Sequence, residues 1–130
     1  MIDCENEIYT LIVEALGDDI NVTSEYVKSP ASFPHVSVVM TDNYTIENRY
    51  DTSMTDNLVE VSFEINVYSN KTNGKKTECK NILQTIDELL YTMNFTRTAF
   101  TPVPNVEDAT IYRLTAVYSV VTDGEYFYRR

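Results

Sequence analysis

The stretch Ser69–Thr77, SNKTNGKKT, carries the residue types of a phosphate-binding loop. It lies between an alternating apolar run and a helical pattern, which is also the context of the loop G-x-x-x-x-G-K-[ST] in nucleotide hydrolases. Aligned on Gly74-Lys75, however, the chain has Ser69 where the first glycine belongs and Lys76 where a hydroxyl would coordinate Mg²⁺. The preceding strand alternates, whereas a central parallel strand is apolar on both faces. The sequence therefore predicts an ordinary turn at Asn73-Gly74, with Lys75 and Lys76 available for a contact with another subunit.

Other reaction chemistries find as little support. The single histidine, His35, opens a strand after Pro34, and no nucleophile or orienting partner is marked for it. Zinc sites need clustered cysteine and histidine, which the sequence lacks. Several aspartates fall in loops, but without the spacing of a calcium-binding loop; they are Asp18, Asp19, Asp42, Asp51 and Asp56. We therefore expect no catalytic residue, no metal site and no cofactor, and we expect that the chain is not an enzyme.

Two cysteines and the charge balance limit the possible environments and partners. Cys4 and Cys79 each occupy an apolar position of a helical pattern and are predicted to be buried free thiols. The N-terminus is acidic where a signal peptide is basic, and no apolar run has the length of a membrane span.

The charge is unevenly distributed along the chain. Residues 1–65 carry 13 acidic and two basic residues, whereas residues 66–130 carry seven acidic and eight basic residues. So acidic a chain does not bind nucleic acid by counterion release; the charge serves solubility, or it lines a passage through which DNA slides.

Hydrophobic periodicity predicts one α+β domain over residues 1–130. Apolar residues recur at helical spacing in two segments and alternate in two of the four predicted strands. Asp3 is a plausible cap for the first helix, and Asn94 can take the left-handed conformation that ends the second. The order is α-β-β-α-β-β, giving a mainly antiparallel sheet with both helices on one face. The predicted elements are helices Ile2–Leu16 and Lys75–Met93 and strands His35–Thr41, Leu58–Tyr68, Phe95–Thr101 and Ala109–Val121.

Three regions outside the predicted core suggest surfaces for partners. Asp42–Asn57 is a long polar stretch that forms either a hairpin arm or a mobile loop. The tail, residues 123–130, is aromatic and ends in two arginines. In Leu58–Tyr68 the face opposite the core carries Glu60 and Glu64, so that face meets water, a partner or a lumen. Tyrosines in the arm and tail suit an interface, or they make an ordinary tyrosine-rich surface; they are Tyr44, Tyr50, Tyr126 and Tyr128.

The combination of several of these runs resembles a known family. FPHVSV, a polar stretch with DN, VSFEINVYSN, GKKTECKNILQTIDELL and NFTRTAFTPVPNVEDATIYRLTAVYSVV together are similar to the tail terminator or tail completion proteins of long-tailed (siphovirus-type) bacteriophages. The resemblance runs from about Phe33 to Val121. No single run is diagnostic.

The resemblance implies a protein of virion assembly. Such a protomer assembles with itself into a ring, typically a hexamer, on the head-proximal end of the tail tube. The ring stops polymerisation of the major tail tube protein and presents a surface to the head connector or stopper protein. DNA passes through the lumen without specific binding, and Glu60 and Glu64 are candidates to line it. The alternatives are a head–tail joining or head-completion (neck) protein and, remotely, a small bacterial enzyme or nucleotide-binding regulator.

Overall fold

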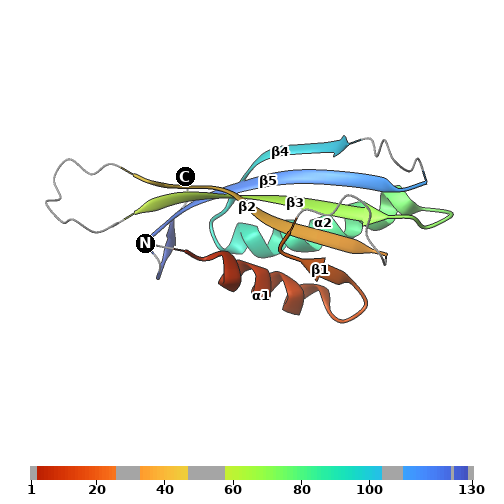
Figure 1. Ribbon diagram of the computed structural model, residues 1–130, viewed down its shortest axis with the longest axis horizontal. Helices are drawn as coiled ribbons and strands as arrows, with labels where there is room; N and C mark the ends of the chain where they lie inside the picture. Colours follow the sequence, from red (N-terminus) through yellow and green to blue (C-terminus); the bar gives the residue numbers. More distant parts are fainter. Residues whose placement is uncertain (1–2, 26–32, 47–57, 104–109, 124, 129–130) are drawn as a thin grey trace, which may run out of the picture.

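Three long strands with alternating apolar residues build the centre of a six-stranded sheet, and two helices cover one face of it (Figure 1). The computed structural model describes residues 3–25, 33–46, 58–103, 110–123 and 125–128. The fold is α+β, as the sequence predicts. Its elements are α1 (Glu5–Leu16), β1 (Asn21–Thr23), β2 (His35–Thr45), β3 (Val59–Ser69), α2 (Lys75–Thr92), β4 (Thr96–Val103), β5 (Tyr112–Thr122) and β6 (Phe127–Tyr128).

The sheet has the order β1-β2-β3-β5-β4, with β6 paired to β5 beyond the start of β4. All neighbours are antiparallel except β1 and β2, which are parallel. The predicted order α-β-β-α-β-β is therefore wrong in detail, because two short strands flank the elements that periodicity reveals. β1 lies between the predicted helix Ile2–Leu16 and the predicted strand His35–Thr41, where the sequence predicts no element. β6 lies in the predicted tail. Strands of two or three residues are too short to show an alternating pattern.

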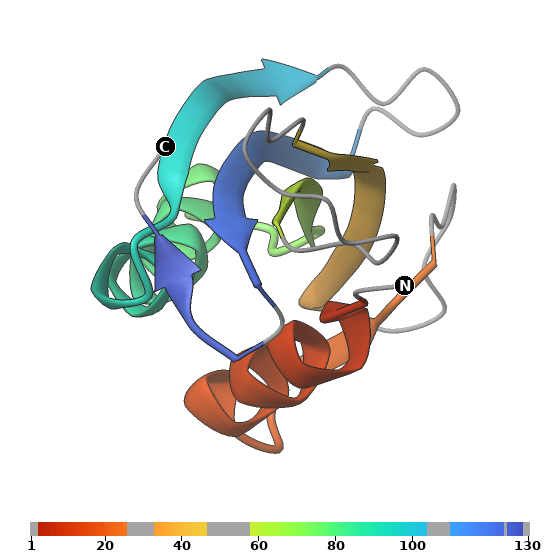
Figure 2. The same cartoon turned by 90° about the vertical axis from the view of Figure 1, so that its left-hand side faces the viewer.

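The core lies between the sheet and the helical layer. Five alternating side chains of β3 are fully withdrawn from solvent on the helix side, and the predicted stripe of α2 packs against them. α1 adds Ile8 and Ile12, both 0 % exposed, and Tyr9 Oη donates a hydrogen bond of 2.9 Å to the Val22 carbonyl of β1. α2 lies between α1 and β4 (Figure 2). The alternating residues of β3 are Val59, Val61, Phe63, Ile65 and Val67.

Of the two predicted helix ends, one is wrong in detail and one is confirmed. The N-cap of α1 is Cys4, which makes no side-chain cap hydrogen bond; Asp3, the predicted cap, lies one residue earlier and accepts a hydrogen bond from the Glu5 amide at 3.0 Å. At the other helix, Asn94 has φ +70°, and its amide donates to the Tyr91 carbonyl while the Phe95 amide donates to the Leu90 carbonyl. These two bonds form a Schellman motif, and buried Phe95 supplies its hydrophobic contact. The predicted left-handed end at Asn94 is confirmed.

Two strands are longer than the sequence predicts. β2 continues through Asp42–Thr45, and the Ile46 amide donates to the Leu58 carbonyl, so the start of the predicted polar arm extends the β2–β3 pairing. The rest of that arm, residues 47–57, lies outside the described residues. β4 continues through Pro102 to Val103, two residues beyond the predicted strand end at Thr101. Proline is tolerated there because β4 is the last strand of the sheet and needs no amide donor on its outer side.

Candidate assembly surfaces

Among the described strands, β4 is the most exposed. Its six central residues, 97–102, are all exposed, whereas β3 and β5 are largely buried. Within the described part of the chain β4 pairs with β5 alone, so its outer edge has no neighbouring strand. An edge of this kind is a template for pairing or packing with another chain. The sequence alone does not reveal this surface, because threonine, alanine and proline in a short strand give no chemical signal.

A groove of about 260 Å³ separates β4 from the outer side of α2. A register shift between Arg97 and Ala99 places Arg97 and Phe100 on the same face of β4, opposite Tyr118 and Ala116 of β5. Strict alternation would have put them on opposite faces, so the sequence could not have paired them. The groove is lined by Lys80, Leu83, Gln84, Asp87, Arg97 and Phe100.

Asp87 anchors one wall of this groove. Its Oδ1 accepts a hydrogen bond of 2.8 Å from Tyr118 Oη, and the Arg97 guanidinium lies 3.3 Å from the same oxygen. Arg97 also lies over the Phe100 ring, 5.2 Å from its centroid. Burial and then the Asp87 carboxylate raise the pKa of Tyr118, so its hydroxyl stays protonated and keeps donating. The groove therefore presents a fixed cation and an aromatic ring that is 45 % exposed.

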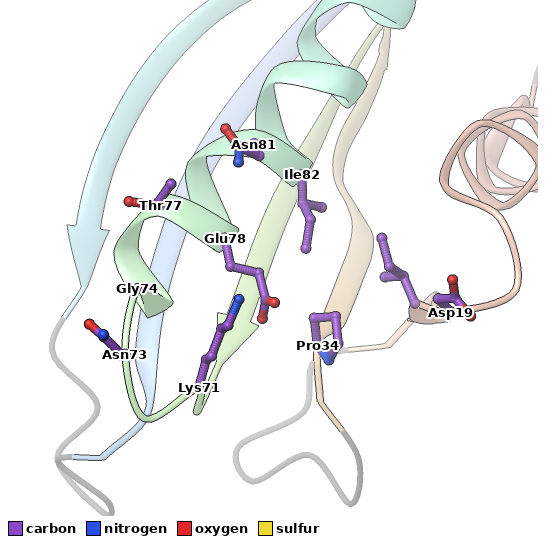
Figure 3. Close-up of a pocket in the computed structure, with 10 residues that line it drawn as sticks. Asp19, Pro34, Lys71, Asn73, Gly74, Thr77, Glu78, Asn81 and Ile82 are labelled. Atoms are coloured by element: carbon purple, nitrogen blue, oxygen red, sulfur yellow. The ribbon is translucent and has the colours of Figure 1, made fainter.

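The loop between β3 and α2, which contains Lys71, Asn73 and Gly74, forms one side of an open cleft of about 590 Å³ (Figure 3). Gly74 has φ +88° and is the N-cap residue of α2, which is consistent with the predicted turn at Asn73-Gly74. Glu78 of the first helical turn accepts a hydrogen bond of 2.7 Å from Ser69 Oγ, and its carboxylate lines the cleft together with Asp19. A phosphate would meet these carboxylates where a nucleotide site offers amides and a hydroxyl.

The two lysines predicted to contact another subunit differ in their surroundings. Lys75 is half-buried, and its Nζ donates to the Thr110 carbonyl at 3.2 Å, which ties α2 to the start of β5. Lys76 is exposed. Of this pair, Lys76 alone extends into solvent.

A transverse row across the sheet brings together three of the predicted surface residues. Tyr44 of β2 lies opposite Glu60 of β3, Glu60 opposite Val121 of β5, and Val121 opposite Tyr128 of β6. Directly opposed residues share a face, and this face is the one opposite the helices. Both tyrosines are exposed, whereas Glu60 between them is 7 % exposed. The sequence could not reveal the row, because it requires the cross-strand register.

The remaining predicted residues lie around this row. Tyr126 is 60 % exposed in the turn before β6, and its amide donates to Asp123 Oδ1 at 2.7 Å. Glu64, half-buried, lies on the same sheet face as Glu60 in the row of Val39, Val117 and Ala99. Tyr50 lies outside the described residues.

A buried polar cluster occupies the other end of this face. His35 is 2 % exposed; its Nδ1 lies 2.9 Å from Asn21 Nδ2 and its Nε2 lies 3.2 Å from Thr23 Oγ1. An amide donor at Nδ1 requires a neutral ring with its proton on Nε2. Burial lowers the pKa of His35, which favours the same neutral form. The histidine therefore joins β1 to β2, and because its protonated Nε2 donates to the Thr23 hydroxyl, this nitrogen cannot act as a base toward that oxygen.

The cysteines are free and buried, as predicted. Burial raises the pKa of Cys4 to about 11 and that of Cys79 to about 12, and nearby carboxylates add to both shifts. Cys79 Sγ lies 3.6 Å from the Val67 carbonyl in the core. Thiols held in their protonated form pack as apolar groups and are poor nucleophiles.

Across the described segments, no three histidine, cysteine, aspartate or glutamate residues are grouped so that they could hold a metal ion. None of the described helices is both long and apolar enough to cross a membrane. No protein-family profile matches the chain, and no curated protein matches it.

Proposed function

We propose that this chain is a tail terminator of long-tailed bacteriophages, a virion protein that assembles in the host cytoplasm. In this proposal several copies, six by the family resemblance, form a ring on the head-proximal end of the tail tube. The ring stops addition of major tail tube protein and offers a surface to the head connector or stopper. DNA passes through its lumen without specific binding.

The observation that carries the proposal is the exposure of β4. A last strand that is exposed on both faces and carries Arg97 and Phe100 is costly to leave uncovered in a single chain. Assembly with further copies would cover it. The exposed tyrosines at the ends of the transverse row, Tyr44 and Tyr128, add a second surface suited to a protein partner.

The family resemblance supports the proposal because the resembling runs lie next to one another in the fold. Its runs fall on β2, β3, α2, β4 and β5. These strands are neighbours in the order β2-β3-β5-β4, and α2 packs on β3 and β5 (Figure 1). The resembling residues thus form one sheet and the helix that covers it, rather than scattered similarities.

Electron microscopy of phage particles produced without this chain tests the proposal. A terminator predicts tubes much longer than normal, because nothing stops tube growth. Tails of normal length that are not attached to heads would instead identify a head–tail joining protein. Normal particles of full infectivity would exclude both functions.

A further inference from the structure

The α2–β4 groove combines cations and an exposed aromatic ring in a strongly acidic chain. Lys80 is exposed and forms no hydrogen bond or ion pair with another described residue. The Arg97 side chain is 49 % exposed even with Asp87 beside it. Leu83 and Phe100 supply the apolar part. A partner for this groove needs carboxylates, with side chains between them small enough to admit the Phe100 ring.

α1 carries such a surface. Residues 3–25 contain seven carboxylates and no lysine or arginine. On the solvent side of α1, Glu7, Thr10 and Glu14 are all exposed. Their spacing of three and four residues aligns them along one side of the helix, with the small threonine between the two carboxylates. We define these three residues as the acidic face of α1.

Within one copy the two surfaces cannot meet. α1 contributes no residue to the groove, and α2 separates α1 from β4 (Figure 2). A contact between them must therefore join different copies, and it uses two different patches of the chain. Such a head-to-tail contact leaves each copy with one free groove and one free acidic face, so it repeats and closes into a ring when the rotation permits.

We propose that the α2–β4 groove of one copy receives the acidic face of α1 of the next copy. Glu7 and Glu14 pair with Lys80 and Arg97, and Phe100 packs between them against Thr10. The proposal rests on the self-assembly that the proposed function requires, and it specifies which surfaces make the contact. Because the charged groups lie at solvent-exposed positions, the contact weakens as salt shortens the Debye length.

Charge exchange between the two surfaces tests this contact. One variant carries Lys80→Glu and Arg97→Glu, a second carries Glu7→Lys and Glu14→Lys, and a third carries all four changes. Association is measured by sedimentation velocity at low salt and high protein concentration. Circular dichroism melting checks that each variant is folded. The matched control is Lys71→Glu with Lys76→Glu, which makes the same change of charge outside the groove.

We expect wild type to associate and each two-residue variant to associate at least tenfold more weakly. An equimolar mixture of the two variants, and the four-residue variant alone, should regain association, because each again offers opposite charges. Variants that associate like wild type, a mixture that stays monomeric, or wild type that stays monomeric would each overturn the contact. Equal loss in the control would place the contact at the β3–α2 loop instead. Overlong tails without the chain, together with failed charge exchange, would leave the terminator function standing and reject this contact alone.

Discussion

At the scale of single residues, His35 makes folding sensitive to pH. The neutral ring accepts from Asn21 and donates to Thr23, and a second proton on the ring would remove the acceptor at Nδ1. Burial lowers the pKa of His35 below its ordinary value of 6.5. The unfolded chain therefore binds this proton more readily than the folded chain.

We predict that His35 does not lower the free energy of unfolding above pH 7. Below pH 6.5 the free energy of unfolding falls as the pH drops, until the pH reaches the lowered pKa of His35 in the folded state. The sign follows because protons favour the state with the higher pKa, which is the unfolded one. Urea unfolding between pH 5 and pH 7.5 measures the slope. Since His35 is the only histidine, His35→Asn should flatten the curve in this window; an unchanged slope would contradict the assignment.

The thiols give a second prediction at this scale. Cys4 and Cys79 are buried, with pKa values of about 11 and about 12. In the folded protein at pH 8 neither should react with an aromatic disulfide reagent on the timescale of minutes, because almost no thiolate is present. Two equivalents should react rapidly in denaturant. Rapid reaction of either cysteine in the native protein would show that its side chain is accessible.

At the scale of elements, the sequence predicted most where the periodic pattern is long. The apolar stripe of α2 and the alternation of β3 revealed both elements within a residue or two, because each buries one continuous face. The polar stretch from Asp42 was predicted to form either a hairpin arm or a mobile loop, and pairing with β3 extends β2 through residues 42–45, as the start of a hairpin arm would. Short β1 and β6 had no pattern to read. The secondary structure of these regions is determined by strand pairing in the folded protein, which a pattern along the sequence does not show.

The candidate surfaces were less predictable than the fold for the same reason. Exposed tyrosines could be identified by type, but their row with Glu60 depends on the pairing of four strands. The groove depends on the register shift that aligns Arg97 with Phe100. Both sites exist only after the strands pair, so a pattern along the chain cannot reveal them.

The end of α2 gives a prediction at the scale of elements. Asn94 holds φ +70°, and its Nδ2 donates to the Phe127 carbonyl of β6 at 2.8 Å. Asn94→Ala should destabilise the protein by about 2 kcal/mol, the sum of left-handed strain and a lost hydrogen bond. Asn94→Gly removes the strain but not the loss of the bond, so its cost should be near 1 kcal/mol. Thermal or urea unfolding gives the order wild type, glycine, alanine; equal stability of the two variants would contradict the role of the backbone conformation.

At the scale of the whole molecule, the chain has one well-packed face and several surfaces that a single copy leaves open. The core lies between the sheet and the two helices, while β4, the groove beside it and the two exposed tyrosines remain available to partners. The charge is divided in the same way, with the acidic helix α1 on one side of α2 and the cations of the groove on the other. A molecule of this kind is suited to repeated contacts with its own copies, as the proposed ring requires.

The most direct measurement of the terminator function is the length of tail tubes when purified protein is added back. Tubes growing in a lysate that lacks this chain are sampled by electron microscopy before and after the addition. The proposed terminator function predicts that lengthening stops on addition of wild-type protein. The proposed contact between copies predicts that lengthening continues when the variant Lys80→Glu, Arg97→Glu is added instead. Tubes that keep growing at the same rate in the presence of excess wild-type protein would contradict the proposal that this chain ends the tail.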